Sequence, residues 1–97
     1  MPTHDEDATF WRDFTVLTDE QADRFWVAVR KFADDLDHGG SIRAGLRVRE
    51  LEGYPGIFEL TWAPDGRATF RYGPEKTPGK RHVIWRRVGT HAIFNNP

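Results

Sequence analysis

The chain has 97 residues, of which 38% are hydrophobic and 30% charged, and it has no cysteine. This length suits a single domain over residues 1–97, and the absence of cysteine excludes disulfides, thiol nucleophiles and cysteine-ligated metals. No apolar run approaches the roughly 20 residues that a membrane-spanning helix needs. The acidic start lacks the basic end and apolar middle of a signal peptide. We therefore expect a cytoplasmic protein with no membrane partner, in which residues 1–8 form a flexible acidic tail.

The net charge of -1 conceals a strong asymmetry along the chain. Residues 1–38 contain ten acidic and four basic side chains, whereas residues 39–97 contain five acidic and ten basic ones. An acidic part beside a basic part that carries aromatic residues suggests two faces with different partners. A polyanion is one candidate for the basic face, and an ordinary solvated surface is the alternative.

The first half of the chain predicts one clear helix. Residues 8–17 are rich in aromatic and β-branched residues, which favours an edge strand or an irregular arm. Thr18 and Gln21 then have the spacing of a capping box, and apolar residues follow at helical spacing over residues 19–37. Gly39 suits the left-handed conformation that often ends a helix. The apolar stripe, which we expect in the core, comprises Ala22, Phe25, Trp26, Val29, Phe32, Ala33 and Leu36.

The second half changes to strand patterns. Strands are expected near residues 57–62 and 67–72, on either side of Ala63-Pro64-Asp65-Gly66, a sequence typical of a tight turn. Because side chains alternate along a strand, the apolar residues of both strands share one face, which we expect to pack on the helix. The opposite face then carries Glu59, Thr61, Arg67 and Arg71.

A third strand is expected near residues 82–87, after a loop rich in glycine and proline. Gly89 is expected to break this strand before Thr90 and His91. The elements together predict the α+β class, with a small antiparallel sheet, mixed at the edge, packed on an N-terminal helix.

Glu59, Arg67, Arg71 and His91 come to one side of this predicted sheet. Such a set suits phosphodiester cleavage without a metal, in which a base removes a ribose 2′-hydroxyl proton, arginines offset charge on the phosphate and an acid protonates the leaving oxygen. The structural alternatives are a surface ion pair and a terminal surface histidine. The four histidines lack metal-ligand spacing, and no phosphate-binding loop or nucleotide fingerprint is present, so we expect neither metal nor small-molecule cofactor.

The order of the elements and the closing Arg87-x-Gly89-Thr90-His91-x-x-Phe94 resemble the RelE/ParE superfamily of bacterial toxin–antitoxin toxins, and most closely its YafQ branch. The resemblance covers residues 42–94 well and the helix loosely. It implies a RelE-like fold, ribosome-dependent cleavage of mRNA and a cognate antitoxin as partner. The chain departs from the family in its single clear helix and in its net charge, since these toxins are typically strongly basic.

The resemblance also implies roles for individual residues. By position, His91 takes the place of the YafQ-type catalytic histidine, and Arg67 that of a strand arginine of RelE- and YoeB-type toxins. Glu59 falls where RelE-type toxins carry a strand lysine, and it is the third catalytic candidate. The candidates for binding RNA phosphates are Arg71, Lys80, Arg81, Arg86 and Arg87.

Three functions remain open at this point. The first is a metal-independent endoribonuclease toxin that acts on mRNA at the ribosome, with His91 as acid or base and Arg67 stabilising the transition state. The second is a noncatalytic interaction module on the same fold. The third is inhibition of gyrase as in ParE toxins, which needs no catalytic histidine.

Overall fold

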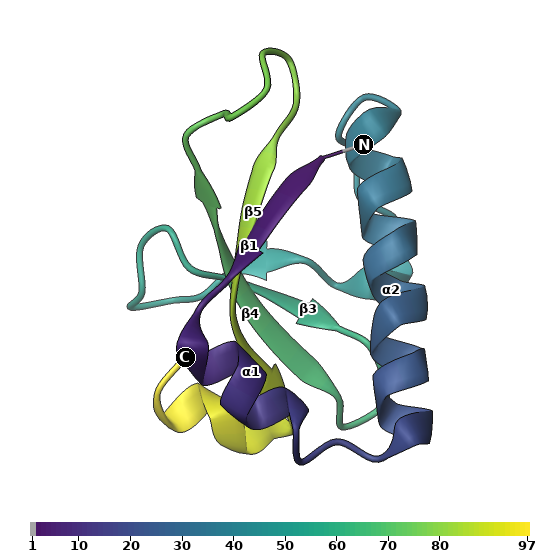
Figure 1. Ribbon diagram of the computed structural model, residues 1–97, viewed down its shortest axis with the longest axis vertical. Coiled ribbons are helices and arrows are strands. Elements are labelled where there is room, and N and C mark those ends of the chain that lie inside the picture. The colour runs from purple at the N-terminus through teal and green to yellow at the C-terminus, as the bar shows by residue number, and fades with distance from the viewer. Residues whose placement is uncertain (1) are drawn as a thin grey trace.

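The structure, a computed structural model, describes residues 2–97 and consists of a five-stranded sheet with helices packed on it (Figure 1). The strand order is β1-β5-β4-β3-β2. β1 runs parallel to β5, and the other neighbouring strands are antiparallel. The sheet is therefore mixed at one edge, which confirms the predicted α+β class. The strands are β1 (Thr3–Glu6), β2 (Arg49–Glu50), β3 (Phe58–Thr61), β4 (Arg67–Gly73) and β5 (His82–Gly89).

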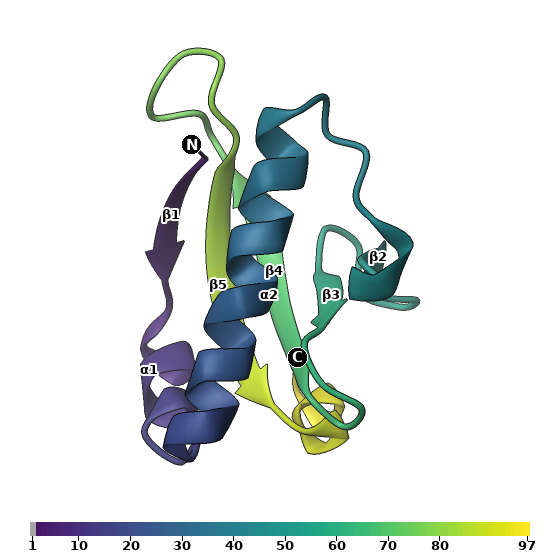
Figure 2. The ribbon, with the colours of Figure 1, turned by 90° about the vertical axis from the view of Figure 1, so that its right-hand side faces the viewer.

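Helix α2 (Asp19–Asp37) has the bounds that the sequence predicts. The Thr18 hydroxyl accepts a hydrogen bond from the Gln21 amide at 3.1 Å, and the Gln21 side chain accepts one from the Thr18 amide at 2.8 Å, which completes the capping box. Beyond the other end, Gly39 has a φ of 103°, the conformation that glycine adopts without strain. The helix lies along one face of the sheet (Figure 2).

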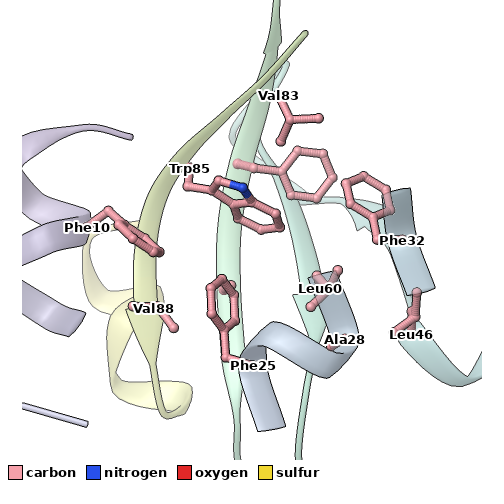
Figure 3. Packing of buried hydrophobic residues seen from close by; sticks show 11 residues of the cluster. Phe10, Phe25, Ala28, Phe32, Leu46, Leu60, Val83, Trp85 and Val88 are labelled. Carbon is pink, nitrogen blue, oxygen red and sulfur yellow. The ribbon is translucent and has the colours of Figure 1, made fainter. Parts of the chain in front are cut away.

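The core fills the space between α2 and the sheet and is largely aromatic (Figure 3). The Trp85 ring lies 5.4 Å from Phe25 of the helix and 5.3 Å from Phe70 of the neighbouring strand, centroid to centroid. Leu60, Phe25 and Phe70 have no solvent exposure. Burial of each such side chain stabilises the fold by about 1.5–3 kcal/mol, so this packing fixes how α2 sits on the sheet.

The pairing of β3 with β4 decides which side chains face away from α2. Phe58 pairs with Phe70, and both pack in the core, as the alternation of the sequence predicts. Glu59 and Arg67 lie on the opposite face of the sheet. They are nevertheless only 5% and 8% exposed.

A β-bulge interrupts the pairing of β4 with β5. The register shifts between Thr69 and Phe70, so β5 has one more residue than β4 at this point. Because of the extra residue, Trp85 and Val88 both reach the core although they are three positions apart. The last residues of β5 are thereby turned relative to its first residues.

Residues 8–17 were predicted as an edge strand or an irregular arm, and this is wrong: Ala8–Phe14 form helix α1. The rings of Phe10 and Phe14 are one turn apart and stack at 5.8 Å, and Phe10 is fully buried beside Phe25. This tertiary packing overrides the preference of aromatic residues for strands. The chain therefore has two N-terminal helices instead of one.

Residues 1–8 were predicted as a flexible acidic tail, but Thr3–Glu6 form β1; residue 1 lies outside the described residues. The strand is held by His82 of β5, whose side chain is 2% exposed. Its Nδ1 lies 2.7 Å from the Thr3 hydroxyl, and its Nε2 donates to the Asp5 carboxylate at 3.0 Å. The acidic segment is thus ordered by a buried histidine that the sequence pattern did not connect with it.

Two short 3₁₀ helices, η1 (Ala44–Leu46) and η2 (His91–Asn95), complete the chain. The segment that follows α2 is attached to the helix by an ion pair. The carboxylate of Asp35 accepts from Nε of Arg43 at 2.9 Å and from Nη2 at 2.8 Å. Neither α1 nor α2 has the length and apolar content needed to cross a bilayer.

Replacing Asp13 with alanine should lower the free energy of unfolding by about 1–3 kcal/mol, since charge-assisted bonds to a largely buried carboxylate are lost. In α1 this carboxylate accepts from Nε and Nη2 of Arg87, at 2.6 and 3.1 Å, and from the Val88 amide at 3.1 Å. Urea denaturation measures the change. Asp23→Ala, at an exposed position of α2, is the matched control. Equal stabilities of the two variants would contradict this role of Asp13.

The bond from Arg43 lowers the pKa of Asp35 from 3.8 to about 2. Because the folded-state pKa is depressed, the pair attaches η1 to α2 fully above pH 3.8, and this contribution is lost as the pH falls through about 2. A titration of the Asp35 carboxyl carbon by NMR should show its midpoint near pH 2. In Arg43→Gln the midpoint should return toward 3.8, and a midpoint that does not move would contradict the assignment.

Candidate active site

A cleft of about 740 Å³ lies on the face of the sheet that is turned away from α2. Its floor includes residues of β3 and β4, and its walls come from the region of β2 and from η2. Glu59, Arg67 and His91, the three residues that the sequence singles out as catalytic candidates, all line it. We call it the first cleft.

The place of His91 follows from the pairing of β4 with β5. Gly89, the last residue of β5, pairs with Arg67, the first residue of β4, so the chain passes the β3–β4 turn as it leaves the sheet. Thr90 caps η2 by accepting from the Ala92 amide at 3.3 Å. His91 is the next residue, and its side chain is 55% exposed.

Gly89 was expected to break the strand, but it is the last residue of β5 and its φ is not positive. Glycine is needed at this position because it has no side chain. A Cβ atom there would lie 3.0 Å from Cγ2 of Ile93, a buried residue of η2. Glycine thus lets η2 pack closely against the end of the strand.

Asp65 is the partner of His91, and the sequence analysis assigned it only to the turn. Its Oδ1 lies 2.5 Å from Nδ1 of His91, and the imidazole also packs edge-on against Phe94. The hydrogen bond from His91 holds the pKa of Asp65 below its usual value, so the carboxylate stays charged. With Nδ1 donating to Asp65, Nε2 is the nitrogen that can exchange a proton with a ligand, and it has no partner within residues 2–97.

Arg67 braces the turn that carries Asp65. Its Nη1 donates to the backbone oxygens of Ala63, Pro64 and Gly66, at 3.1, 3.3 and 2.9 Å. Its Nε and Nη2 make no hydrogen bond within the described chain, so they remain able to bind a ligand oxygen. Arg67 can therefore position the turn and contact an anion in the cleft at the same time.

The same turn is closed by the indole of Trp62. Its Nε1 donates to the backbone oxygen of Arg67 at 3.0 Å, and its ring covers Gly66. A Cβ atom at Gly66 would lie 2.5 Å from that ring. Only glycine fits here, and this is the reason for the glycine in the predicted turn.

Glu59 lies at the floor of the cleft and is paired with Arg49 of β2, whose Nε donates to it at 3.0 Å. The Arg49 side chain is 76% exposed, whereas that of Glu59 is 7% exposed. The ion pair thus joins the edge strand β2 to β3. It is also open to displacement from the solvent side, because only one partner is buried.

The predicted phosphate ligands lie outside the lining of the first cleft. Arg71 is half-buried on the same face of the sheet. Arg81 stacks on the Tyr72 ring at 3.8 Å, and Lys80 is exposed beside it. Nε and Nη2 of Arg86 donate to the backbone oxygen of Pro97. Their role in RNA binding, and that of Arg87, which is held by α1, stays a prediction.

Arg47 is a lining residue that the sequence analysis did not identify. It follows η1 and has a φ of 49°, in the left-handed region that favours glycine. Strained backbone of this kind persists only where the surrounding structure enforces it, and it clusters at functional sites. No sequence pattern marked the position, because arginine gives no signal for a left-handed conformation.

By sequence, the chain matches no family model and no curated protein. Solved structures do match over nearly the whole chain. A chain of the RelB–RelE antitoxin–toxin complex from Methanococcus jannaschii has a TM-score of 0.64 and 15% identity, with 96% of this chain and 99% of that chain covered. YafQ from Escherichia coli strain BL21(DE3) has a TM-score of 0.64 and 14% identity, with 97% and 98% covered.

A third match is the YoeB/ParE toxin from Agrobacterium tumefaciens, with a TM-score of 0.68, 13% identity, and 92% of this chain and 98% of that chain covered. At these identities the likeness is one of backbone arrangement. It agrees with the two N-terminal helices and the mixed sheet described above. The chain therefore has the fold that the RelE, YafQ and YoeB/ParE toxins share.

Proposed function

We propose that the chain is the toxin of a toxin–antitoxin pair and acts as a metal-independent endoribonuclease on mRNA at the ribosome. The observation that carries the proposal is that Arg67 and His91, which is held by Asp65, line one cleft on a fold shared with toxins. An imidazole oriented by a carboxylate and a guanidinium with free donors are the groups that acid–base cleavage of a phosphodiester requires.

In the proposed reaction the ribose 2′-oxygen attacks the neighbouring phosphorus, and the bond from phosphorus to the 5′-oxygen breaks. One group takes the proton of the 2′-hydroxyl, and another gives a proton to the 5′-oxygen that leaves. His91 performs one of these transfers through Nε2, and Glu59 is the candidate for the other once Arg49 is displaced. The free donors of Arg67 offset the charge that develops on the phosphate.

Two further observations support the proposed partners. Structures similar to this chain include complexes of toxins with antitoxins, RelB–RelE and DinJ–YafQ, which supports a cognate antitoxin. The net charge of -1 gives little long-range attraction for free RNA. This favours a substrate that the ribosome presents to the toxin.

A noncatalytic interaction module is the second candidate. The observation that favours it is that two catalytic candidates already have structural roles. Arg67 braces a turn through three backbone oxygens, and Glu59 is paired with Arg49. On this reading the cleft binds a partner without cleaving it.

Induced expression of the chain in bacteria should arrest growth, and transcripts should acquire new 5′ ends inside translated codons. Growth curves and mapping of RNA 5′ ends measure the two effects. Full growth with unchanged transcripts, from protein shown to be folded, would favour the interaction module. Arrest without new 5′ ends would favour gyrase inhibition.

His91→Ala should lower the cleavage rate by about 10²–10⁴-fold with the fold intact, because one proton transfer loses its catalyst. Arg67→Ala should also be severe, through lost charge stabilisation and a loosened turn. Arg86→Ala should be milder, since Arg86 lies outside the lining of the cleft. Cleavage of ribosome-bound mRNA is the assay, and circular dichroism checks each fold.

The control is His38→Ala, which removes an exposed histidine at the end of α2 and should cleave at the parental rate. Parental cleavage by His91→Ala, together with loss of cleavage in Arg86→Ala, would make His91 a surface residue only.

A further inference from the structure

A second cleft, of about 400 Å³, lies between α2, η1 and the β3–β4 turn. It shares Arg47, Thr61 and Arg67 with the first cleft, so these three residues form the wall between the two. Among residues 2–97, every charged residue that lines the second cleft is a cation. The cations are Arg24, Lys31, Arg43, Arg47 and Arg67.

This concentration of positive charge is unexpected on α2, whose sequence is acidic overall. None of the helix's aspartates or glutamates lines the cleft, whereas two of its three basic residues do. Arg24 and Lys31 are seven positions apart, so they lie on one side of the helix, two turns from each other. The third basic residue, Arg30, does not line the cleft.

Three of these cations have no partner within residues 2–97. Arg43 is occupied by Asp35, but the side chains of Arg24, Lys31 and Arg47 make no hydrogen bond or ion pair in the described chain. In the shared wall, the Thr61 hydroxyl is buried and also lacks a hydrogen-bond partner. The cleft therefore offers unsatisfied donors for an anionic ligand.

The apolar part of the lining fits the uncharged part of such a ligand. Val27, 41% exposed, and the ring of Trp62 lie in the cleft beside Ala28 and Leu46. A nucleotide has this same division, with a flat base that packs on apolar surface and a phosphate that binds cations. An acidic peptide would match the cations but would not use the apolar lining in the same way.

We infer that the second cleft binds the RNA strand where it continues from the first cleft. Phosphates of the strand contact Arg24, Lys31 and Arg47, and a base packs on Val27 and Trp62. The inference rests on the proposed function, because the shared wall makes one strand continuous through both clefts. Arg47, whose backbone is held in the left-handed region, stands where the strand would pass from one to the other.

The test uses a single-stranded RNA oligonucleotide whose 2′-hydroxyls are methylated, so that it binds without being cleaved. The double variant Arg24→Gln/Lys31→Gln should bind it at least about tenfold more weakly than the parent in low salt. The salt dependence should become shallower by about 0.7 per phosphate contact removed. Arg30→Gln removes a charge from the same helix outside the cleft and should keep the parental affinity. Fluorescence anisotropy measures binding.

Equal affinities of the double variant and Arg30→Gln, with a parent that binds and cleaves RNA, would overturn the second cleft and leave the proposed function intact. An acidic peptide is the second probe. If the double variant loses binding to this peptide but keeps the parental affinity for the oligonucleotide, the second cleft binds a protein ligand and the inference is overturned. A folded parent that cleaves ribosome-bound mRNA without binding the oligonucleotide would overturn the second cleft alone. A folded parent that does neither would overturn both proposals.

Discussion

The site depends on the hydrogen bonds that the guanidinium of Arg67 donates to the β3–β4 turn. By binding three backbone oxygens of the turn, this guanidinium sets the position of Asp65, and Asp65 in turn orients His91. It also stands in the wall between two clefts. Burial of this cation is tolerated because the turn supplies acceptors that water would otherwise provide.

Core packing delivers these groups to the opposite face of the sheet. The aromatic contacts of Trp85 and Phe70 fix β4 and β5 against α2, and the bulge between them turns the end of β5. The close fit of Gly89 against Ile93 then seats η2 beside the turn. The geometry of His91 is thus set by residues that lie outside the lining of the cleft.

Much of this architecture could be predicted from the sequence. The bounds of α2, the β3–β4 turn and the faces of its strands follow from capping and periodicity, which are local signals. The convergence of Glu59, Arg67 and His91 followed from that alternation and from a family resemblance.

Other features depend on contacts between distant parts of the chain, which local patterns do not report. Helix α1 forms because Phe10 is buried against Phe25 of α2. Strand β1 forms because the buried side chain of His82 binds Thr3 and Asp5. The Asp65–His91 pair could have been found from strand pairing, since Gly89 lies opposite Arg67. No sequence pattern indicated the left-handed backbone of Arg47 or the cationic side of α2.

Arg87 joins parts of the chain that are far apart in sequence. It binds the carboxylate of Asp13 in α1, and its Nη1 donates to the backbone oxygen of Asn96 at 2.8 Å. One guanidinium therefore couples α1 to Asn96, the residue that follows η2. During synthesis, the early residues cannot complete this bridge until residues more than seventy positions later have emerged. Contacts of such long sequence separation close a long loop and form late in folding, so the first cleft cannot be complete until η2 has emerged behind β5.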